Sequence, residues 1–235
     1  MTSLGTLRSI TRFPVKSMAG ETLHTVFLSA DGLTGDRAYA FESSNAPAGM
    51  LRLTALQRRG MLQFRAWTDD DGCVQVTTPS GGTFPVDAPT LPQHFADPGT
   101  YRLVHSYAPQ TDVRPIAIHT VRDMAALSSN FGSNVDPRRF RSNLVFDLDM
   151  PLTTNSILSI GREAQLELLE PIPRCRFITY DPAMPMTGEP LFGLMRHLDR
   201  HHGGRMGIYA RVRAPGNIRA GDVVSLVCPP ASNTA

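Results

Sequence analysis

Short apolar segments separated by glycine- and proline-rich turns run through most of the chain. The segment 21–29, ETLHTVFLS, alternates apolar and polar positions, meets the turn cluster DGLTGD, and is followed by RAYAFES. Farther on, CVQVTTP follows the turn DDDG, and TFPVD follows SGG. Alternation bounded by turn residues is typical of half-buried strands joined as hairpins. The first half is therefore predicted to be a series of β-hairpins that ends in a proline-rich stretch at about 88–99, the best boundary candidate.

The second half mixes strands with two predicted helices. PIAIHT is predicted to be a buried strand, and Thr120 with Asp123 resembles a capping box ahead of a short helix that ends near FGSN. Pro190 could open a second helix at its first turn, because apolar residues recur at i, i+3, i+4 and i+7 from Leu191 up to the glycines at 203 and 204. The other segments predicted as strands are RRFRSNLVFDL, SILSIG, AQLELLE, IYARV and VVSLV, with turns at APGN and RAGD. This pattern predicts a strand-rich α+β fold with a β-barrel in the second half.

The composition narrows the classes of protein that the chain could belong to. The 235 residues carry a net charge of only +2, with no dominant basic stripe, so no nucleic-acid partner is expected. No segment approaches the roughly 20 apolar residues of a membrane span, and the first residues lack a signal-peptide stretch, so no membrane partner is expected. The three cysteines are odd in number and widely spaced, which predicts neither a disulfide framework nor a paired metal site. A reducing, cytoplasmic location is the expectation.

Cys175 lies between two arginines, Arg174 and Arg176, in the stretch EPIPRCRFITYDP. Positive charge stabilises the ionised thiolate, which is both a nucleophile and a soft metal ligand. A free cysteine is more often a buried apolar side chain, but flanking arginines are poor neighbours in a dry core. The local sequence leaves both interpretations open.

Two further motifs place cations at tight turns. In FPVKSMAG, Lys16 and Ser17 follow a proline and precede a glycine, where they could hold an anion or could be a solvated strand end. In GLTGDR, Asp36 and Arg37 follow a turn, where they could belong to a binding site or form an ordinary surface ion pair.

The motif RRFRSN adds a third group of cations. Read as a strand, it would place Arg139 and Arg141 on one face, with Asn143 beyond them. The arginine fork suits phosphate, although a basic edge strand that resists aggregation is the alternative. Together with Cys175, these motifs describe a basic pocket with one activated thiol, suited to an anionic, metal-bearing ligand.

In order and spacing, PVKSMAGE, GLTGDR, RRFRSNLV, RCRFITYDP with the following TG, and GNIRAGDVV resemble the MOSC family. This family is named after the C-terminal domain of molybdenum-cofactor sulfurase and includes the mitochondrial amidoxime reducing component and its bacterial relatives. The resemblance covers nearly the whole chain. It implies an N-terminal β-barrel-like module at 1–98 and a MOSC domain at 99–235, a β-barrel with short flanking helices.

The resemblance also implies a cofactor, the pterin-based Mo-molybdopterin. Cys175 occupies the position of the cysteine that ligates molybdenum in the family, so it would be both the metal ligand and the catalytic residue. Arg141 and Asn143 would suit the phosphate and the pterin edge. The positions that match cofactor contacts are Lys16, Ser17, Arg37, Asp112, Arg141, Asn143, Arg174 and Tyr209.

The activity implied by the resemblance is that of a molybdenum-dependent oxidoreductase. It would reduce small N-hydroxylated or N-oxide substrates by removing the oxygen atom, with Asp181 as a polar group near the substrate. The sequence has no ferredoxin-like cysteine cluster, so electrons would come from a separate protein: a ferredoxin- or cytochrome b5-type carrier or a flavin reductase. Ser142 replaces a proline that is common in the family reductases, and PLTTNS replaces an acidic residue and a tryptophan. These departures leave substrate and partner open.

Two other functions remain open at this stage. Cys175 could carry sulfur as a persulfide, or the protein could store or deliver the cofactor without catalysis. A zinc hydrolase is a weaker alternative, because His197 and His201 would share a helix face, next to His202. A solvated helix C-terminus explains these histidines better, since the helix dipole favours cations there.

Overall fold

The computed structural model describes the chain except for residues 1, 47–51, 96–98, 112, 185 and 229–235. Its largest element is a barrel made by strands β1 (Thr2–Arg12), β10 (Ile116–Thr120), β11 (Leu144–Leu148), β12 (Ile157–Ile160), β13 (Ala164–Pro173), β14 (Arg205–Ala214) and β16 (Val223–Cys228). The strands follow the order β11-β10-β14-β13-β12-β16-β1, and antiparallel pairing of β1 with β11 closes the seven-stranded barrel. A short strand, β2 (Glu21–Leu23), pairs with the end of β1. The predicted barrel is confirmed.

The barrel takes its first strand from the N-terminal end of the chain. Strand β1 pairs with β11 on one side and β16 on the other, so it lies among strands of the second half. Gly5 makes the close approach to β11 possible. Its φ is +144°, and a Cβ there would lie 2.0 Å from the carbonyl oxygen of Asp147. The barrel interior is filled by apolar side chains with no exposed surface, among them Leu7, Ile10, Ile118, Leu144, Phe146, Leu166 and Leu168.

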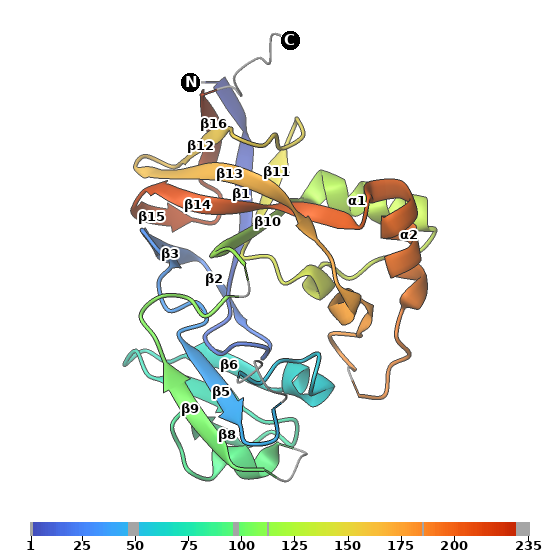
Figure 1. The fold of residues 1–235 in the computed structure, drawn as a ribbon. Coiled ribbons are helices and arrows are strands. Elements are labelled where there is room, and N and C mark those ends of the chain that lie inside the picture. The colour runs from blue at the N-terminus through green and yellow to red at the C-terminus, as the bar shows by residue number, and fades with distance from the viewer. Residues whose placement is uncertain (1, 47–51, 96–98, 112, 185, 229–235) are drawn as a thin grey trace.

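The first half of the chain folds into smaller sheets next to the barrel (Figure 1). These sheets contain strands β3 (Thr25–Ser29), β4 (Gly32–Leu33), β5 (Tyr39–Ser43), β6 (Arg65–Thr68), β7 (Val74–Thr77), β8 (Thr83–Pro85) and β9 (Tyr101–His105). The hairpins predicted around DDDG and SGG are confirmed, because β7 pairs with β6 and with β8. The hairpin predicted between ETLHTVFLS and RAYAFES is wrong, because β3 pairs with β4 inside the turn cluster and β5 pairs with β9. Strand β15 (Gly216–Arg219) returns from the C-terminal end to pair with β3, so the predicted APGN turn is shorter than expected. Two 3-10 helices, η1 (Arg59–Gln63) and η2 (Leu91–His94), complete this region, which has its own apolar core.

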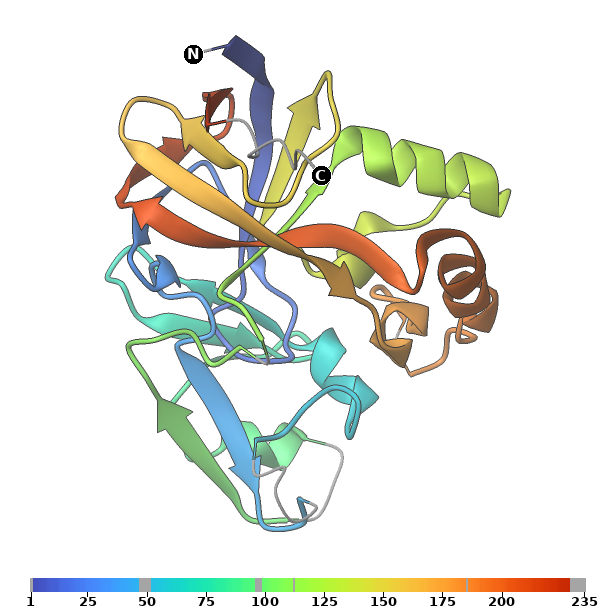
Figure 2. The ribbon, with the colours of Figure 1, turned by 45° about the horizontal axis from the view of Figure 1, so that its top comes forward.

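Two α-helices, α1 (Val121–Phe131) and α2 (Phe192–His202), lie on one side of the barrel in both views (Figures 1 and 2). The predicted cap is confirmed: the Thr120 hydroxyl accepts a hydrogen bond from the backbone N–H of Asp123 at 2.9 Å. Helix α2 begins two residues after Pro190, not at it. Among the described residues, no helix has the length and apolar character needed to cross a membrane.

A small third core fixes the loops around Cys175. It joins the two α-helices to two 3-10 helices, η3 (Pro137–Phe140) and η4 (Arg176–Thr179). Its fully or nearly fully buried members include Leu127, Phe140, Ile178, Leu194 and Leu198. Because η3 carries the RRFRSN motif and η4 follows Cys175, this core positions both.

The prediction that RRFRSN forms a strand is wrong. Pro137 opens η3, the Asp136 carboxylate accepts the N–H of Arg138 at 2.9 Å, and Arg141 ends the turn in a left-handed conformation. Proline at the first helical turn and an aspartate cap favour a helical turn over a strand. Strand β11 begins only at Leu144. Arg139 and Arg141 therefore do not share a strand face.

Candidate functional site

Side chains from all four motifs line one cavity of about 210 Å3, called here the Cys175 cavity. Of the site residues predicted from the sequence, Asp112 lies outside the described residues and Asn143 does not line the cavity. The others do: Lys16, Ser17, Arg37, Arg141, Arg174, Cys175 and Tyr209. The tertiary fold thus brings together residues that lie up to 193 positions apart in the sequence, from 16 to 209.

Cys175 lies where a barrel strand gives way to a loop. Prolines at 171 and 173 coincide with irregular pairing between β13 and β14, and Cys175 then precedes η4 and accepts a backbone hydrogen bond from Ile178 at 3.3 Å. The residue is exposed. The interpretation of Cys175 as a buried core cysteine is therefore wrong, because its thiol can be reached by a ligand in the cavity.

The backbone of the cavity wall is unusual at three positions. Ser17, Arg37 and Arg141 have φ angles of 68°, 48° and 48°, and elsewhere in the described non-glycine residues only Asn155 has a positive φ. Each such conformation costs on the order of 1–3 kcal/mol and persists where the surrounding structure enforces it, most often at functional sites. The clustering of three of them in one cavity indicates that the fold is built around this site.

Two of these arginines are held against one aromatic ring. The guanidinium carbon of Arg141 lies 4.1 Å from the centre of the Phe13 ring, and that of Arg37 lies 5.2 Å from it. Arg141 also donates to the carbonyl of Met18 at 2.7 Å. Arg37 pairs with Asp36, whose carboxylate is 1% exposed and accepts the N–H of Phe13 at 2.8 Å. This is a buried pair and not the ordinary surface ion pair considered above, so it fixes the position of Arg37.

Asn143 supports the cavity from behind. It is fully buried, and its Oδ1 accepts hydrogen bonds from the N–H of Ala117 at 3.1 Å and from Arg37 at 3.4 Å. Its Nδ2 donates to the carbonyl of Thr11 at 3.3 Å. Because the amide group is engaged by the protein, Asn143 positions Arg37 and joins β1, β10 and β11 in this structure.

Arg139 clamps the loop that carries the cysteine. Its Nη1 donates to the carbonyls of Ile178, Thr179 and Tyr180 at 3.2, 3.0 and 2.5 Å. Burial lowers the pKa of Arg139, and the nearby Asp181 partly opposes that shift. The sequence suggested a phosphate ligand at Arg139, but the structure engages this guanidinium with the backbone at the end of η4.

Asp181 shapes the same loop. Its Oδ1 accepts the N–H groups of Ala183 and Met184 at 2.8 and 3.1 Å, and these hydrogen bonds lower its pKa. Its other oxygen lies 3.6 Å from Arg139. Asp181 does not line the Cys175 cavity.

Arg174 places a buried cation beside the thiol. Its Nε donates to Met206 O at 2.8 Å and its Nη1 to Phe140 O at 2.9 Å, whereas its buried Nη2 has no hydrogen-bond partner among the described residues. Burial lowers the pKa of Arg174 to about 10, against the opposing effects of Tyr209 and Cys175. A guanidinium in the cavity wall that forms no ion pair with a carboxylate among the described residues favours an anion in the cavity.

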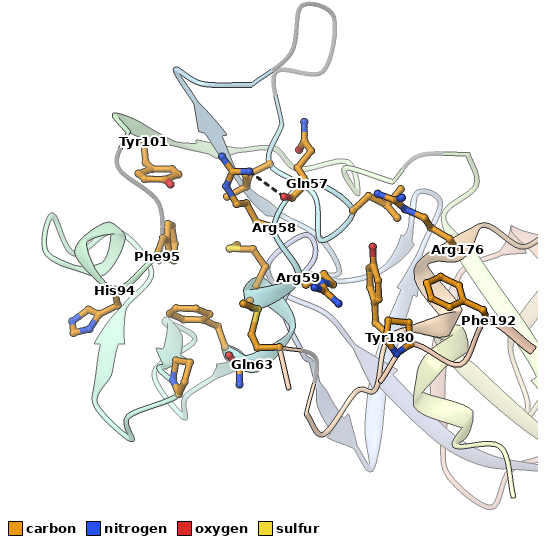
Figure 3. A pocket seen from close by; sticks show the side chains of 18 residues that line it. Gln57, Arg58, Arg59, Gln63, His94, Phe95, Tyr101, Arg176, Tyr180 and Phe192 are labelled. Carbon is orange, nitrogen blue, oxygen red and sulfur yellow. Dashed lines mark hydrogen bonds between the residues drawn. The ribbon is translucent and has the colours of Figure 1, made fainter. Parts of the chain in front are cut away.

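Two larger cavities share lining residues with the Cys175 cavity. One, of about 580 Å3, is lined by Arg176 and shares Leu56 with it (Figure 3). The other, of about 500 Å3, shares Arg139, Arg141 and Phe177. The two arginines that flank the cysteine therefore diverge: Arg174 lines the Cys175 cavity and Arg176 the 580 Å3 cavity.

The 500 Å3 cavity is lined by a buried histidine, His119, whose environment predicts a pH dependence of stability. His119 is 3% exposed, its Nδ1 has no hydrogen-bond partner among the described residues, and Arg139 and Arg141 line the same cavity. Burial, and then the charge of Arg174, lowers the pKa of His119 to about 4. The native state therefore binds the His119 proton more weakly than the unfolded chain does.

We expect His119 to make the protein less stable in mild acid. As pH falls from 6.5 towards 4, the unfolded chain takes up a proton on His119 before the native state does, and this favours unfolding. The stability that depends on neutral His119 is therefore complete above pH 6.5 and is lost progressively between pH 6.5 and 4. The loss should reach about 3 kcal/mol of unfolding free energy. Denaturant unfolding at several pH values should show a shallower dependence for His119→Gln. An unchanged pH dependence in the variant would contradict the assignment.

The histidines of α2 pack together at its C-terminal end. The ring centres of His197 and His201 are 4.6 Å apart, and the His197 ring also contacts Phe131. Burial first, and then the neighbouring cations, lowers the pKa of His197. In the described part of the chain, no group of three or more His, Cys, Asp or Glu side chains is placed to hold a metal ion.

Sequence reasoning missed several residues that build the site. Phe13, which holds two arginines, and Leu56, which lines two cavities, were given no role from the sequence. Phe13 could have been noticed because it is the first residue of the FPVKSMAG motif. Leu56 lies in a segment with no chemical signal, so only the tertiary structure reveals it.

Family models match both halves of the chain: the MOSC N-terminal beta barrel domain over residues 4–106 and the MOSC domain over residues 94–225. The chain belongs to the MOSC-domain family. The family expected from the motifs is thereby confirmed, and the two matched ranges overlap around the boundary predicted at 98/99, which stays a prediction. No curated protein sequence matches this chain significantly.

Two solved structures share the overall fold of this chain. The YuaD protein from Bacillus subtilis is 15% identical, with 93% of each chain covered and a TM-score of 0.52. A hypothetical protein is 12% identical over 98% of this chain and 71% of its own, with a TM-score of 0.50. At these identities the likeness concerns the fold alone. YiiM from Geobacillus stearothermophilus is 18% identical over 56% of this chain and 69% of its own, and its TM-score of 0.41 supports no conclusion about this chain.

Proposed function

We propose that this MOSC-family protein binds a pterin-based molybdenum cofactor, Mo-molybdopterin, in the Cys175 cavity and reduces small N-hydroxylated or N-oxide compounds. MOSC domains are associated with binding of the molybdenum cofactor in general. The observation that carries the proposal is the convergence of one exposed thiol and several fixed cations on a single cavity. A protein without such a ligand would have little reason to maintain three left-handed backbone positions there.

The residues present fit the proposed group chemically. A thiolate is a soft donor suited to molybdenum, and Cys175 presents its sulfur to the cavity rim. Lys16 is 8% exposed, and its Nζ donates to the carbonyl of Gln110 at 3.0 Å, so its charge is held at the wall. The Arg174 guanidinium adds a further cation at the cavity wall. The anionic phosphate of a pterin cofactor would be stabilised by these cations.

The protein residues have separate roles in this proposal. Cys175 ligates the metal, while Arg37 and Arg141, held by Phe13, anchor the anionic part. Arg139 keeps the cysteine loop in place through the carbonyls at the end of η4. When bound, the cofactor supplies the two-electron chemistry that removes oxygen from nitrogen.

The overall reaction balances with an external donor. Two electrons and two protons enter, the N–O bond of the substrate breaks, and the amine or amidine and one water leave. We propose that the electrons come from a separate cytoplasmic protein, of the ferredoxin or cytochrome b5 type or a flavin reductase. Cys175 is not oxidised in this scheme, because it remains a ligand throughout.

The exposure of Cys175 also supports a second candidate function. A thiol that can be reached from outside could carry a persulfide or take part in delivery of the cofactor. This carrier would not need a substrate pocket or an electron donor.

Turnover with an artificial reductant distinguishes these candidates. Protein from a host that makes the cofactor should reduce benzamidoxime to benzamidine with reduced methyl viologen as the donor. Release of benzamidine, measured by chromatography, is the expected result. Retained cofactor without turnover of any hydroxylamine, amidoxime or N-oxide tested would contradict the reductase and favour the carrier.

A further inference from the structure

The largest of the three cavities described above is an open pocket of about 580 Å3, called here the arginine pocket (Figure 3). Its volume falls within the range of ordinary small-molecule sites. One wall comes from residues 53, 56–61, 63, 64, 79, 94, 95 and 101, and the other from residues 176, 180, 186, 190 and 192. It therefore lies where the first-half sheets meet the loop that follows Cys175.

The pocket is positively charged. Arg58, Arg59 and Arg176 line it, and none of the described lining residues is an aspartate or glutamate. The Arg59 guanidinium lies 5.3 Å from the centre of the Tyr180 ring, and Arg58 donates to the carbonyl of Gln57 at 3.1 Å. Arg176 is exposed, and its guanidinium forms no hydrogen bond or salt bridge with the described residues. Three cations without a lining carboxylate favour an anionic ligand.

Most of the other lining residues are apolar, and five of them are Phe or Tyr; Gln57, Gln63 and His94 are the polar exceptions. Phe95 makes edge contacts with Phe64 and Tyr101, with ring centres 5.2 and 5.1 Å apart. In the view of Figure 3, Arg59 lies between this group and Tyr180 with Phe192. Phe192 is 55% exposed, although it lines the pocket. A ligand with a flat apolar part would pack against these rings, and a negatively charged group on the same ligand would contact the arginines.

The arginine pocket also adjoins the thiol. Leu56 lines both this pocket and the Cys175 cavity, and Arg176 follows Cys175 directly in the chain. A molecule seated among the aromatic residues could therefore extend past Leu56 towards the sulfur.

We propose that the arginine pocket is the substrate pocket, and that it selects aromatic N-hydroxylated compounds carrying a carboxylate or phosphate away from the N–O group. This inference rests on the proposed function for the identity of the reacting group. The pocket itself consists of protein side chains alone, so the preference for an anionic aromatic ligand does not depend on the cofactor. A concave aromatic lining fits a small molecule, whereas an acidic protein partner would require a broad, flat surface.

The test compares two substrates that differ in one charge. We expect 4-carboxybenzamidoxime to have a higher kcat/KM than benzamidoxime, with reduced methyl viologen as the donor. The ratio of the two values should fall about tenfold or more in Arg59→Gln and in Arg176→Gln, because a charge-assisted contact is lost. The matched control is Arg8→Gln, an exposed arginine on β1 outside the pocket, which should keep the wild-type ratio.

A binding measurement separates this inference from the proposed function. Calorimetry with cofactor-free protein should show 4-carboxybenzamidoxime binding to the wild type and at least about tenfold weaker binding to Arg176→Gln. Such binding without turnover by loaded protein would uphold the pocket and reject the reductase. Turnover with an unchanged ratio in both variants, or equal binding of the charged and neutral compounds, would overturn the pocket assignment. The pocket assignment would also be overturned if the arginine variants lost activity only when an acidic electron-donor protein, and not methyl viologen, supplied the electrons.

Discussion

Replacing Cys175 with alanine is expected to lower the turnover of N-hydroxylated substrates by at least about a hundredfold, because loss of even a supporting residue near a metal costs 10–100-fold. The thermal unfolding temperature should change little. Cys175 is exposed, so the substitution leaves no cavity in a packed core. Steady-state assays with methyl viologen, together with thermal unfolding of the same preparations, would measure both effects.

Cys73→Ala is the matched control for this experiment. Cys73 is also a free and exposed cysteine, but it directly precedes β7 and lines none of the three cavities described above. The control should retain wild-type turnover. Normal turnover by the Cys175 variant would contradict its assignment as the metal ligand. A parallel loss in both variants would point to a general effect of removing thiols.

Replacing Arg141 is expected to weaken retention of the cofactor about tenfold to a hundredfold, since one charge-assisted contact contributes roughly 1.5–3 kcal/mol. Arg141 is held in the cavity wall by Phe13 and the carbonyl of Met18. Its φ of 48° makes alanine strained there, so Arg141→Gly removes the same side chain without that cost. Molybdenum content after extensive dialysis is the measurement.

Arg138→Ala is the control for the Arg141 variants. Arg138 belongs to η3, the 3-10 helix that Arg141 caps, but it is exposed, pairs with Asp136 and does not line the Cys175 cavity. It should retain molybdenum like the wild type. Unchanged molybdenum in both Arg141 variants would remove Arg141 from the cofactor site. Loss in Arg141→Ala but not in Arg141→Gly would show that the backbone, and not the charge, is responsible.

Local sequence signals predicted most of the fold because each depends on neighbouring residues. The Thr120 cap, the glycine that ends α2 and the hairpins of β6, β7 and β8 all follow from such signals. The RRFRSN strand failed because Pro137 and Asp136 outside the motif determined its conformation. The closure of the barrel by β1 depends on pairing across more than 130 residues, as between Gly5 and Leu148, which no local pattern contains.

The candidate site, like the fold, was predicted from the sequence only in part. The motifs predicted which cations would gather, since Lys16, Arg37, Arg141 and Arg174 do line one cavity. They did not predict what each side chain does there. Asn143 faces inward to hold Arg37, because its amide satisfies backbone groups of two strands. The arginine pocket could not be predicted from the sequence, since only Arg176 and Tyr180 in its lining belong to a motif and the opposite wall comes from segments without one.

The most direct test of the central claim is the molybdenum and pterin content of protein purified from a host that makes the cofactor. The Cys175 cavity predicts about one molybdenum and one pterin per chain in the wild type, because it is a single site. It predicts a clear loss of molybdenum in Cys175→Ala and no loss in Cys73→Ala. Wild-type protein that carries neither molybdenum nor pterin, or a Cys175 variant that retains both in full, would contradict the account.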